Sequence, residues 1–519
     1  MRRLLVLLTM IALHTHAAED GDLATERWFA SETNNFIIYS QLSERQTERR
    51  ANALEEWRNA ALQVLGVADS QPLDPIKTYF YLFDDVDDYA LFAEGDDAAY
   101  FFSSPRANFI IAQSSAAGID MAQHHYAHFL INNRSIGVPR WYEEGMSQYL
   151  SRLEPAGSDI ELSGFSAADY GLMAALNADL PLDDLLYDDA ALASPRLIQI
   201  ANLKAAFFVH FLRHGQLHDG FEDRSDKLQS YLGFLQQGRS ERFAYDQAFN
   251  LSARRMDEEF DRFLVKGQRR GDGEIDILEL AEQREFEALE VPRDEIELAL
   301  AEISLHSGRF PLAAFYFERL MEEGNGGGRA YSGYADAKRM LITPPDEGAV
   351  ADITPQELEL LYQRALEIAP ADFQLQLDFG QYYDSLRDDC ENPLSPAQLQ
   401  RVEQGMSTHF EAALALNPGS AEVNLSNGQL FLFESKDWQQ GLVYQDKAFA
   451  LLPADTFVQE QAIEYAILAN DYDKANGLID RMARPMHFWG TPFWIRDLRN
   501  KLRAAERGEI FDPCAQAPQ

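Results

Sequence analysis

The sequence contains few cysteines and few basic residues, and both shortages narrow the possible functions. Only two of its 519 residues are cysteines, Cys390 and Cys514, and they lack the close spacing of zinc ligands. A disulfide between them and two unlinked thiols are equally consistent with the sequence. The 45 Lys and Arg residues are outnumbered by 84 Asp and Glu residues, giving a formal net charge of −39. Such a charge argues against nucleic acid or an anionic membrane as the partner.

Long apolar runs are also missing, apart from a short one near the N-terminus. A basic start at residues 1–3 precedes an apolar run over residues 4–13, and small residues follow at Ala17 and Ala18. This pattern predicts a secretory signal peptide over residues 1–18, with an uncleaved anchor as the alternative. No later segment approaches the roughly 20 apolar residues of a membrane helix. We therefore expect an exported protein, periplasmic or secreted, without a membrane span.

The first part of the chain has the pattern of a small sheet with helices. Apolar and aromatic runs predict strands over residues 36–39 and 77–83, and a hairpin over residues 98–113. Apolar residues at helical spacing predict a helix over residues 42–65, ending at Gly66. Beyond residue 119 the chain is expected to be almost entirely helical, with helices over residues 141–152 and 197–214 and two more within 228–264.

Three histidines in five residues form the most informative motif, H-H-Y-A-H. His124 and His128 have the i, i+4 spacing that places two imidazoles on one face of a helix. A helix commonly offers two ligands to zinc in this way. Zinc hydrolases with an H-E-x-x-H motif carry their general-base Glu at the position that His125 occupies here. The spacing therefore predicts a zinc site whose catalytic base has changed.

A second motif follows at a fixed distance. Gly137, Val138 and Pro139 break the first helix, and W-Y-E-E-G places Glu144 16 residues after His128. The two motifs together resemble the gluzincin class of zinc metallopeptidases, with H-x-x-x-H followed by W-x-x-E-G.

The resemblance covers about residues 27 to 265 and implies a fold and a set of ligands. It implies an α+β, zincin-like N-terminal domain in which His124, His128 and Glu144 hold zinc. Glu143 is the alternative third ligand if the register differs by one residue. The expected organisation is a signal peptide (1–18), a peptidase-like domain (19–265), a linker or first helix (266–291), helical repeats (292–505) and a tail (506–519).

Two positions depart from the pattern that the resemblance implies. His125 replaces the general base, whose loss costs roughly 10²–10⁴-fold in rate. A neutral imidazole beside a metal dication could still accept a proton, so some hydrolysis stays possible. Asn202 stands where such domains often carry a Tyr that stabilises an oxyanion, and its amide could donate a weaker hydrogen bond. His125 and Asn202 are therefore the candidate catalytic residues.

The C-terminal half carries an internal repeat. The segments R-A-L-E-I-A-P, A-A-L-A-L-N-P and A-F-A-L-L-P end at Pro370, Pro418 and Pro453. Their separations are 48 and 35 residues, which implies an insertion around residues 390–396. A period near 34 with a helix-ending Pro is typical of tetratricopeptide repeats. We expect an all-α solenoid that binds a protein partner on its concave face.

Other motifs give weaker signals. His210 and His214 have i, i+4 spacing on an apolar helix and could mimic a second metal site. We interpret them as a packed histidine and a histidine that complements the helix dipole. Trp141 and Tyr149 are expected in the core. No Ser-His-Asp order, P-loop or dinucleotide fingerprint is convincing.

Three functions remain open at this point. The first is a degenerate metallopeptidase-like protein that binds peptide or protein. The second is an active zinc peptidase with His125 or a water network as base. The third is a scaffold without metal, in which the repeats carry the function.

Overall fold

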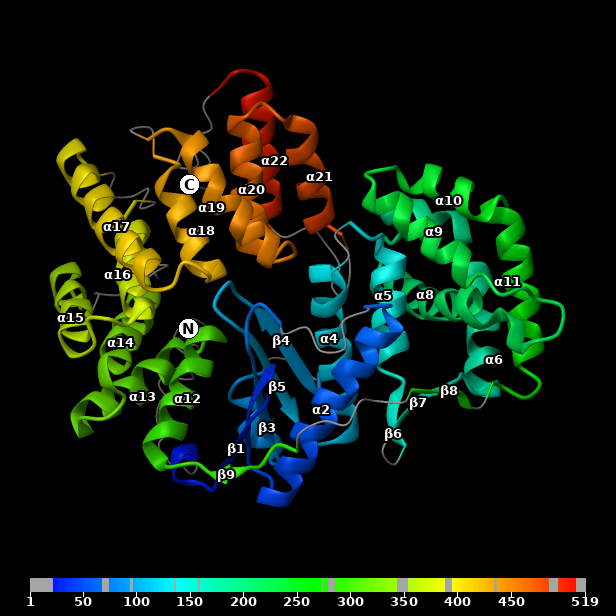
Figure 1. Ribbon diagram of the computed structural model, residues 1–519, viewed down its shortest axis with the longest axis horizontal. Helices are drawn as coiled ribbons and strands as arrows, with labels where there is room; N and C mark the ends of the chain where they lie inside the picture. The colour runs from blue at the N-terminus through cyan, green and yellow to red at the C-terminus, as the bar shows by residue number, and fades with distance from the viewer. Residues whose placement is uncertain are drawn as a thin grey trace, which may run out of the picture.

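The structure is a computed structural model, and its described part is mainly helical with a small mixed sheet near the N-terminus (Figure 1). No described helix is long and apolar enough to cross a membrane. The expected signal peptide (1–18), Cys390 and Cys514 lie outside the described residues. The described residues are 22–67, 74–93, 97–134, 137–156, 159–272, 274–278, 285–342, 353–387, 394–433, 436–484 and 493–509.

The N-terminal sheet has six strands in the order β4-β5-β3-β2-β1-β9. The three central strands β2, β3 and β5 run parallel, and β1, β4 and β9 pair antiparallel with their neighbours. The expected hairpin is present as β4 and β5. The strands are β1 (Phe29–Glu32), β2 (Phe36–Ser40), β3 (Thr78–Phe83), β4 (Ala99–Ser103), β5 (Asn108–Gln113) and β9 (Leu289–Glu290).

Both faces of this sheet are covered by helices. In β3, alternate side chains point to opposite faces, so Phe80 and Leu82 join the core formed with α2 (Glu44–Val64) and α4 (Ala116–Arg134). Tyr81 and Phe83 join a second core. That core is formed with helices that follow residue 291, namely α12 (Arg293–His306), α13 (Phe310–Glu323) and α14 (Gly327–Ile342).

A hydrogen bond and a ring contact fix α12 on the sheet. The Tyr81 hydroxyl donates to the Ala299 carbonyl at 2.9 Å, and the Phe109 and His306 rings stack with centroids 4.5 Å apart. Residues 266–291, expected as a linker or first helix, supply strands β8 (Glu274–Leu278) and β9. The repeats are therefore joined to the N-terminal part through a shared core.

The region after α4 holds more strand and more helices than the sequence pattern indicated. A second, three-stranded sheet has the order β6-β7-β8, so the chain beyond residue 119 is less uniformly helical than expected. Residues 225–267 form α9, α10 and α11, one helix more than the expected pair, because Asn250 ends α10 in a left-handed conformation. The other elements are β6 (Leu153–Ala156), β7 (Asp159–Ser163), α3 (Val86–Ala90), α5 (Arg140–Leu150), α6 (Ala167–Leu176), α7 (Leu182–Tyr187), α8 (Pro195–His214), α9 (Ser225–Gln236), α10 (Glu241–Phe249) and α11 (Ala253–Gly267).

The C-terminal half is a series of helices with a repeated helix ending. α15, α17 and α19 each end with a backbone N–H that donates to the carbonyl of the repeated alanine, Ala365, Ala413 or Ala448. The capping residues have nearly the same φ, −135°, −143° and −134°. The shared geometry supports tetratricopeptide-like repeats. The helices are α15 (Pro355–Ile368), α16 (Phe373–Ser385), α17 (Pro396–Leu416), α18 (Ala421–Leu430), α19 (Trp438–Leu451), α20 (Thr456–Leu468), α21 (Tyr472–Met482) and α22 (Phe493–Glu506).

The repeats curve around the sheet and meet the N-terminal part again at their far end (Figure 1). Beyond α21, Arg484 donates a 2.8 Å hydrogen bond to the carbonyl of Val138 in the turn between α4 and α5. The same guanidinium lies 3.3 Å from Glu241 at the start of α10. Residues more than 200 positions apart are thus brought together beside the predicted metal site.

Candidate metal centre

Two close helix contacts position the predicted ligands. A Cβ on Gly118, in the first turn of α4, would lie 2.2 Å from the carbonyl oxygen of Gln113 at the end of β5. A Cβ on Gly145, in α5, would lie 2.6 Å from the carbonyl oxygen of Ala205 in α8. Only glycine allows the backbones to approach this closely. The Gly in W-x-x-E-G therefore lets α8 fix α5, which carries Glu144.

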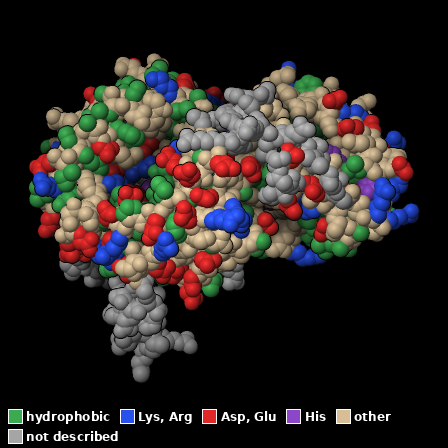
Figure 2. Space-filling model, turned by 60° about the horizontal axis from the view of Figure 1, so that its bottom comes forward, with side chains coloured by type: hydrophobic (Ala, Val, Ile, Leu, Met, Phe, Trp, Pro, Cys, Tyr) green, Lys and Arg blue, Asp and Glu red, His purple; other side chains and the backbone are tan. Residues whose placement is uncertain are grey.

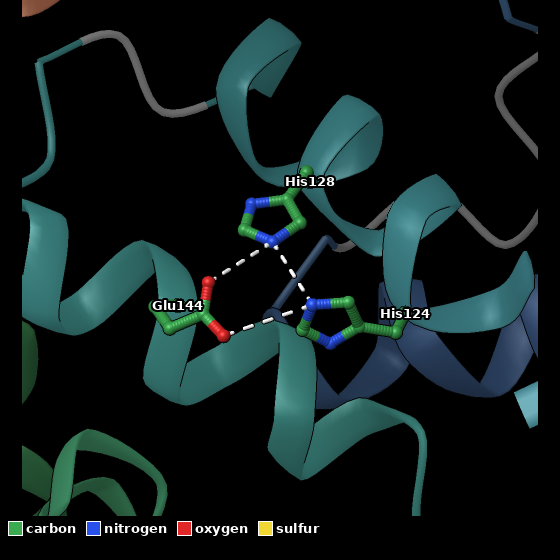
Figure 3. A group of neighbouring side chains, drawn as sticks. All are labelled: His124, His128 and Glu144. Carbon is green, nitrogen blue, oxygen red and sulfur yellow. Dashed lines mark hydrogen bonds and ion pairs between the residues drawn. The ribbon is translucent and has the colours of Figure 1, made fainter. Parts of the chain in front are cut away.

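The structure brings His124, His128 and Glu144 together (Figure 3). Their ligand atoms all lie within 4.8 Å of one another, and among the described residues they are the one such set of three donors. The Glu144 carboxylate lies 3.7 Å from His124 Nε2 and 3.4 Å from His128 Nε2. Its side chain is fully buried. Glu144, and not the alternative Glu143, faces the two imidazoles.

Neighbouring side chains orient these donors. Glu143 lies 2.9 Å from His128 Nδ1, which leaves Nε2 of the same ring directed toward His124 and Glu144. Asn132 donates a hydrogen bond to Glu143, and Gln148 donates one of 2.9 Å to Glu144. A carboxylate on the far nitrogen of a ligating histidine is a common support of zinc sites.

Two carboxylates control the protonation of His128. Burial alone would lower its pKa, but hydrogen bonds to Glu143 and Glu144 outweigh burial and raise the pKa to about 9. Burial opposes ionisation of Glu143 as well, yet the contact with His128 lowers its pKa. Each of the two groups therefore stabilises the charged form of the other.

The two candidate catalytic residues lie in different surroundings. His125 is half-buried on α4, with its ring centroid 5.7 Å from that of His124. Asn202 is buried on α8, and its side-chain oxygen accepts a hydrogen bond from Arg140 at the start of α5. Burial lowers the pKa of Arg140, although Glu144 and other acids oppose this effect. The proposed catalytic roles of His125 and Asn202 stay predictions.

Sequence reasoning missed three groups around the site. Gln148 lies one turn after Glu144, and its i, i+4 spacing could have suggested contact with the carboxylate. Arg140 precedes the Trp of the second motif without any local sign of its role. Arg484, which follows α21, contacts the turn before α5, and its charge helps to lower the pKa of Glu143. No pattern within either segment indicates this contact.

The donor set fits zinc. Two imidazole nitrogens and one carboxylate are the ligands of many catalytic zinc sites. A dication held by the two Nε2 atoms and the fully buried Glu144 carboxylate would take the place of the proton that His128 otherwise carries beside this carboxylate.

Trp141 and Tyr149 lie in the core, as predicted, at 1% and 0% exposure. The other histidine pair lies in the same core and is not part of a described three-donor cluster. His210 is fully buried, with Nε2 2.9 Å from Asp272 just after α11. His218 Nε2 lies 2.8 Å from the other oxygen of the same carboxylate.

His214 does not complement the helix dipole as a cation. Burial, together with His210 and Arg213, lowers its pKa to about 3 from the ordinary 6.5. The unfolded chain therefore binds more protons than the folded protein below pH 6.5, so stability falls as the pH falls from 6.5 toward 3.

The lowered pKa of His214 predicts that acid destabilises the protein, and that replacing His214 reduces this effect. Each pKa unit corresponds to about 1.4 kcal/mol, so protonation of unfolded His214 costs about 2 kcal/mol of stability at pH 5. Denaturant unfolding at pH 7 and pH 5 should show that His214→Phe loses about 2 kcal/mol less than the wild type between these pH values. Equal losses in both proteins would contradict the assignment.

No protein-family model and no curated protein sequence matches the chain. Among solved structures, it is similar to a thermophilic tetratricopeptide-repeat protein of Thermus thermophilus, with a TM-score of 0.32 and 14% sequence identity. That similarity covers 41% of this chain and 99% of the other.

Proposed function

We propose that this protein is an exported, metallopeptidase-like zinc protein that binds peptide or protein and has lost the standard general base. The cluster of His124, His128 and Glu144 carries the proposal, because three donors from two helices converge within 4.8 Å. The N-terminal apolar run supports export. The helical repeats supply a surface for a protein partner.

The residues around the site have different expected roles. His124, His128 and Glu144 would hold zinc, which supplies Lewis acidity when bound. Glu143 contacts Nδ1 of His128 and so orients its ring, and Gln148 orients Glu144. No carboxylate occupies position 125, so proton transfer is the step that the site performs poorly.

The sheet edge beside α4 offers a place for an extended peptide. Strand β4 has one neighbour, β5, among the described residues, and four of its five residues are half-buried. The Phe101 ring on β4 lies 6.4 Å from that of Phe129 on α4, so this strand is adjacent to the helix that carries both histidines. A peptide that adds to a sheet edge gains main-chain hydrogen bonds.

Metal analysis of the purified protein tests the proposal. We expect about one zinc ion per chain after dialysis, and less with Glu144→Gln. Absence of zinc and of comparable metals would remove both metal-based functions and leave the repeats as a scaffold. Metal-dependent hydrolysis by the wild type would mean that the protein is an active peptidase and that its site is not degenerate.

Removing the support of His128 should weaken zinc binding without abolishing it. Loss of such an outer carboxylate typically costs 10–100-fold in metal affinity. Glu143→Gln should therefore show a 10–100-fold higher zinc Kd in competition with a chelator. Glu322→Gln, an exposed change on α13, serves as the control with the same chemistry. An unchanged Kd in Glu143→Gln would mean that Glu143 does not orient the ligand.

A further inference from the structure

A groove runs along the inner side of the repeats, away from the metal site. It encloses about 750 Å³ and is lined by side chains from the repeats and by the tip of the β4–β5 hairpin at Ser104, Pro105 and Arg106. This volume is within the range of pockets that hold small ligands or peptide side chains. The hairpin thus forms one end of the groove.

Successive repeat helices place carboxylates along this groove. Asp378 comes from α16, Glu422 from α18 and Glu460 from α20. We call these three residues the carboxylate ladder. Glu422 and Glu460 line the groove, and Asp378 lies next to it in contact with Arg106.

The protein's own hairpin occupies the first two positions of the ladder. Arg106 lies 2.6 Å from Asp378 and 3.0 Å from Glu422, and its side chain is 16% exposed. Glu422 also accepts hydrogen bonds from Gln374 and Gln381, each at 3.1 Å. Asp378 and Glu422 therefore bind the guanidinium of Arg106, which extends from the turn between β4 and β5.

The third position of the ladder differs from the first two, because no guanidinium from the described residues pairs with its carboxylate. Within the described part of the chain, Glu460 has no ion-pair partner, and Lys501 is paired with its neighbour Glu464 one turn along α20. Burial and the charges of Glu464 and Asp455 raise the pKa of Glu460 to about 7, and the charge of Lys501 opposes this shift. Phe457, 53% exposed, lines the groove one turn before Glu460.

The charge of the groove indicates which kind of ligand it binds. Five carboxylates line it against three arginines, and Arg106 and Arg329 are already engaged with Asp378. Asp and Glu side chains are also spread across the face of the molecule in Figure 2. An acidic surface attracts a cationic partner from a distance, and a half-buried carboxylate holds it at contact.

We propose that this groove binds a basic segment of a partner polypeptide, with an Arg or Lys side chain at Glu460 beside Phe457. The inference deepens the proposed function, since it rests on the repeats being a partner-binding surface. The partner's cationic side chain pairs with Glu460 in the same way as Arg106 pairs with Asp378 and Glu422. Phe457 contributes a ring face for the aliphatic stem or the cation.

Peptide binding by the full-length protein tests the inference. The probe is a fluorescein-labelled ten-residue peptide with three arginines separated by glycine and alanine. Its counterpart carries three glutamates at the same positions. In fluorescence anisotropy at pH 8, the arginine peptide should bind at least 10-fold more tightly than the glutamate peptide. Glu460→Gln should weaken the arginine peptide at least 5-fold.

Glu322→Gln is the matched control, because it removes the same charge from the exposed side of α13. It should bind the arginine peptide like the wild type. Equal weakening in Glu460→Gln and Glu322→Gln, or equal binding of both peptides, would overturn the inference. Zinc content should be unchanged in Glu460→Gln, so failure of the groove is distinguished from failure of the metal site.

Discussion

A chain that ends at residue 291 should not fold into a stable N-terminal domain. This truncation removes α12, α13 and α14, which cover one face of the sheet. Tyr81, Phe83, Phe109 and Ile111 on that face are each at most 3% exposed in the full protein. Burying a large apolar side chain contributes about 1.5–3 kcal/mol, so the four together contribute about 6–12 kcal/mol. That is comparable with the whole stability of a typical domain.

The expected result is aggregation or the loss of cooperative thermal unfolding, measured by expression and near-UV circular dichroism. A chain ending at residue 342 is the control, because it keeps α12 to α14 and the core that they form with the sheet. It should be soluble and unfold cooperatively. Cooperative unfolding of the shorter chain would mean that the region up to residue 291 is an independent domain.

The sequence indicated that both faces of the sheet are buried, but it did not indicate that α12, α13 and α14 cover one of these faces. The strand over residues 78–83 is apolar or aromatic at nearly every position, as in sheets that are buried on both faces. The glycine-rich segment around residues 266–275 nevertheless predicted a linker. Pairing of β8 and β9 with distant strands depends on tertiary contacts that no local pattern records.

The candidate site was more predictable, because its residues are close in sequence. The i, i+4 spacing of His124 and His128 determined their shared helix face, and the break at residues 137–139 allowed α5 to return toward it. The choice between Glu143 and Glu144 needed the structure. One carboxylate faces the two imidazole nitrogens and the other lies behind His128.

The contacts between the repeats and the N-terminal part were beyond sequence reasoning. Arg106 and Glu422 are 316 residues apart, yet they form an ion pair. The repeated alanines and prolines predicted helix pairs correctly, since each copy encodes its own helix ending. They contain no information on which segment would enter the groove.

Introducing a carboxylate at position 125 should produce peptide hydrolysis. In the metallopeptidase-like site that we propose, the His/His/Glu cluster and the supporting Glu143 are present, and the general base is the missing component. A positioned base contributes typically 10²–10⁴-fold in rate. With zinc present, His125→Glu should therefore cleave a mixture of quenched fluorescent peptides at least 100-fold faster than the wild type. Glutamate favours helix more than histidine does, so α4 should tolerate the change.

A double variant decides whether the new activity uses the metal centre. Adding Glu144→Gln to His125→Glu should remove the gain, because the third ligand is lost while the new base remains. If His125→Glu binds zinc and stays as inactive as the wild type, the missing base is not the sole defect. Asn202 is then the next residue to change, since its side-chain oxygen is engaged by Arg140 and Asn202→Tyr would test oxyanion stabilisation separately. Activity that survives in the double variant would instead place the hydrolysis outside this site.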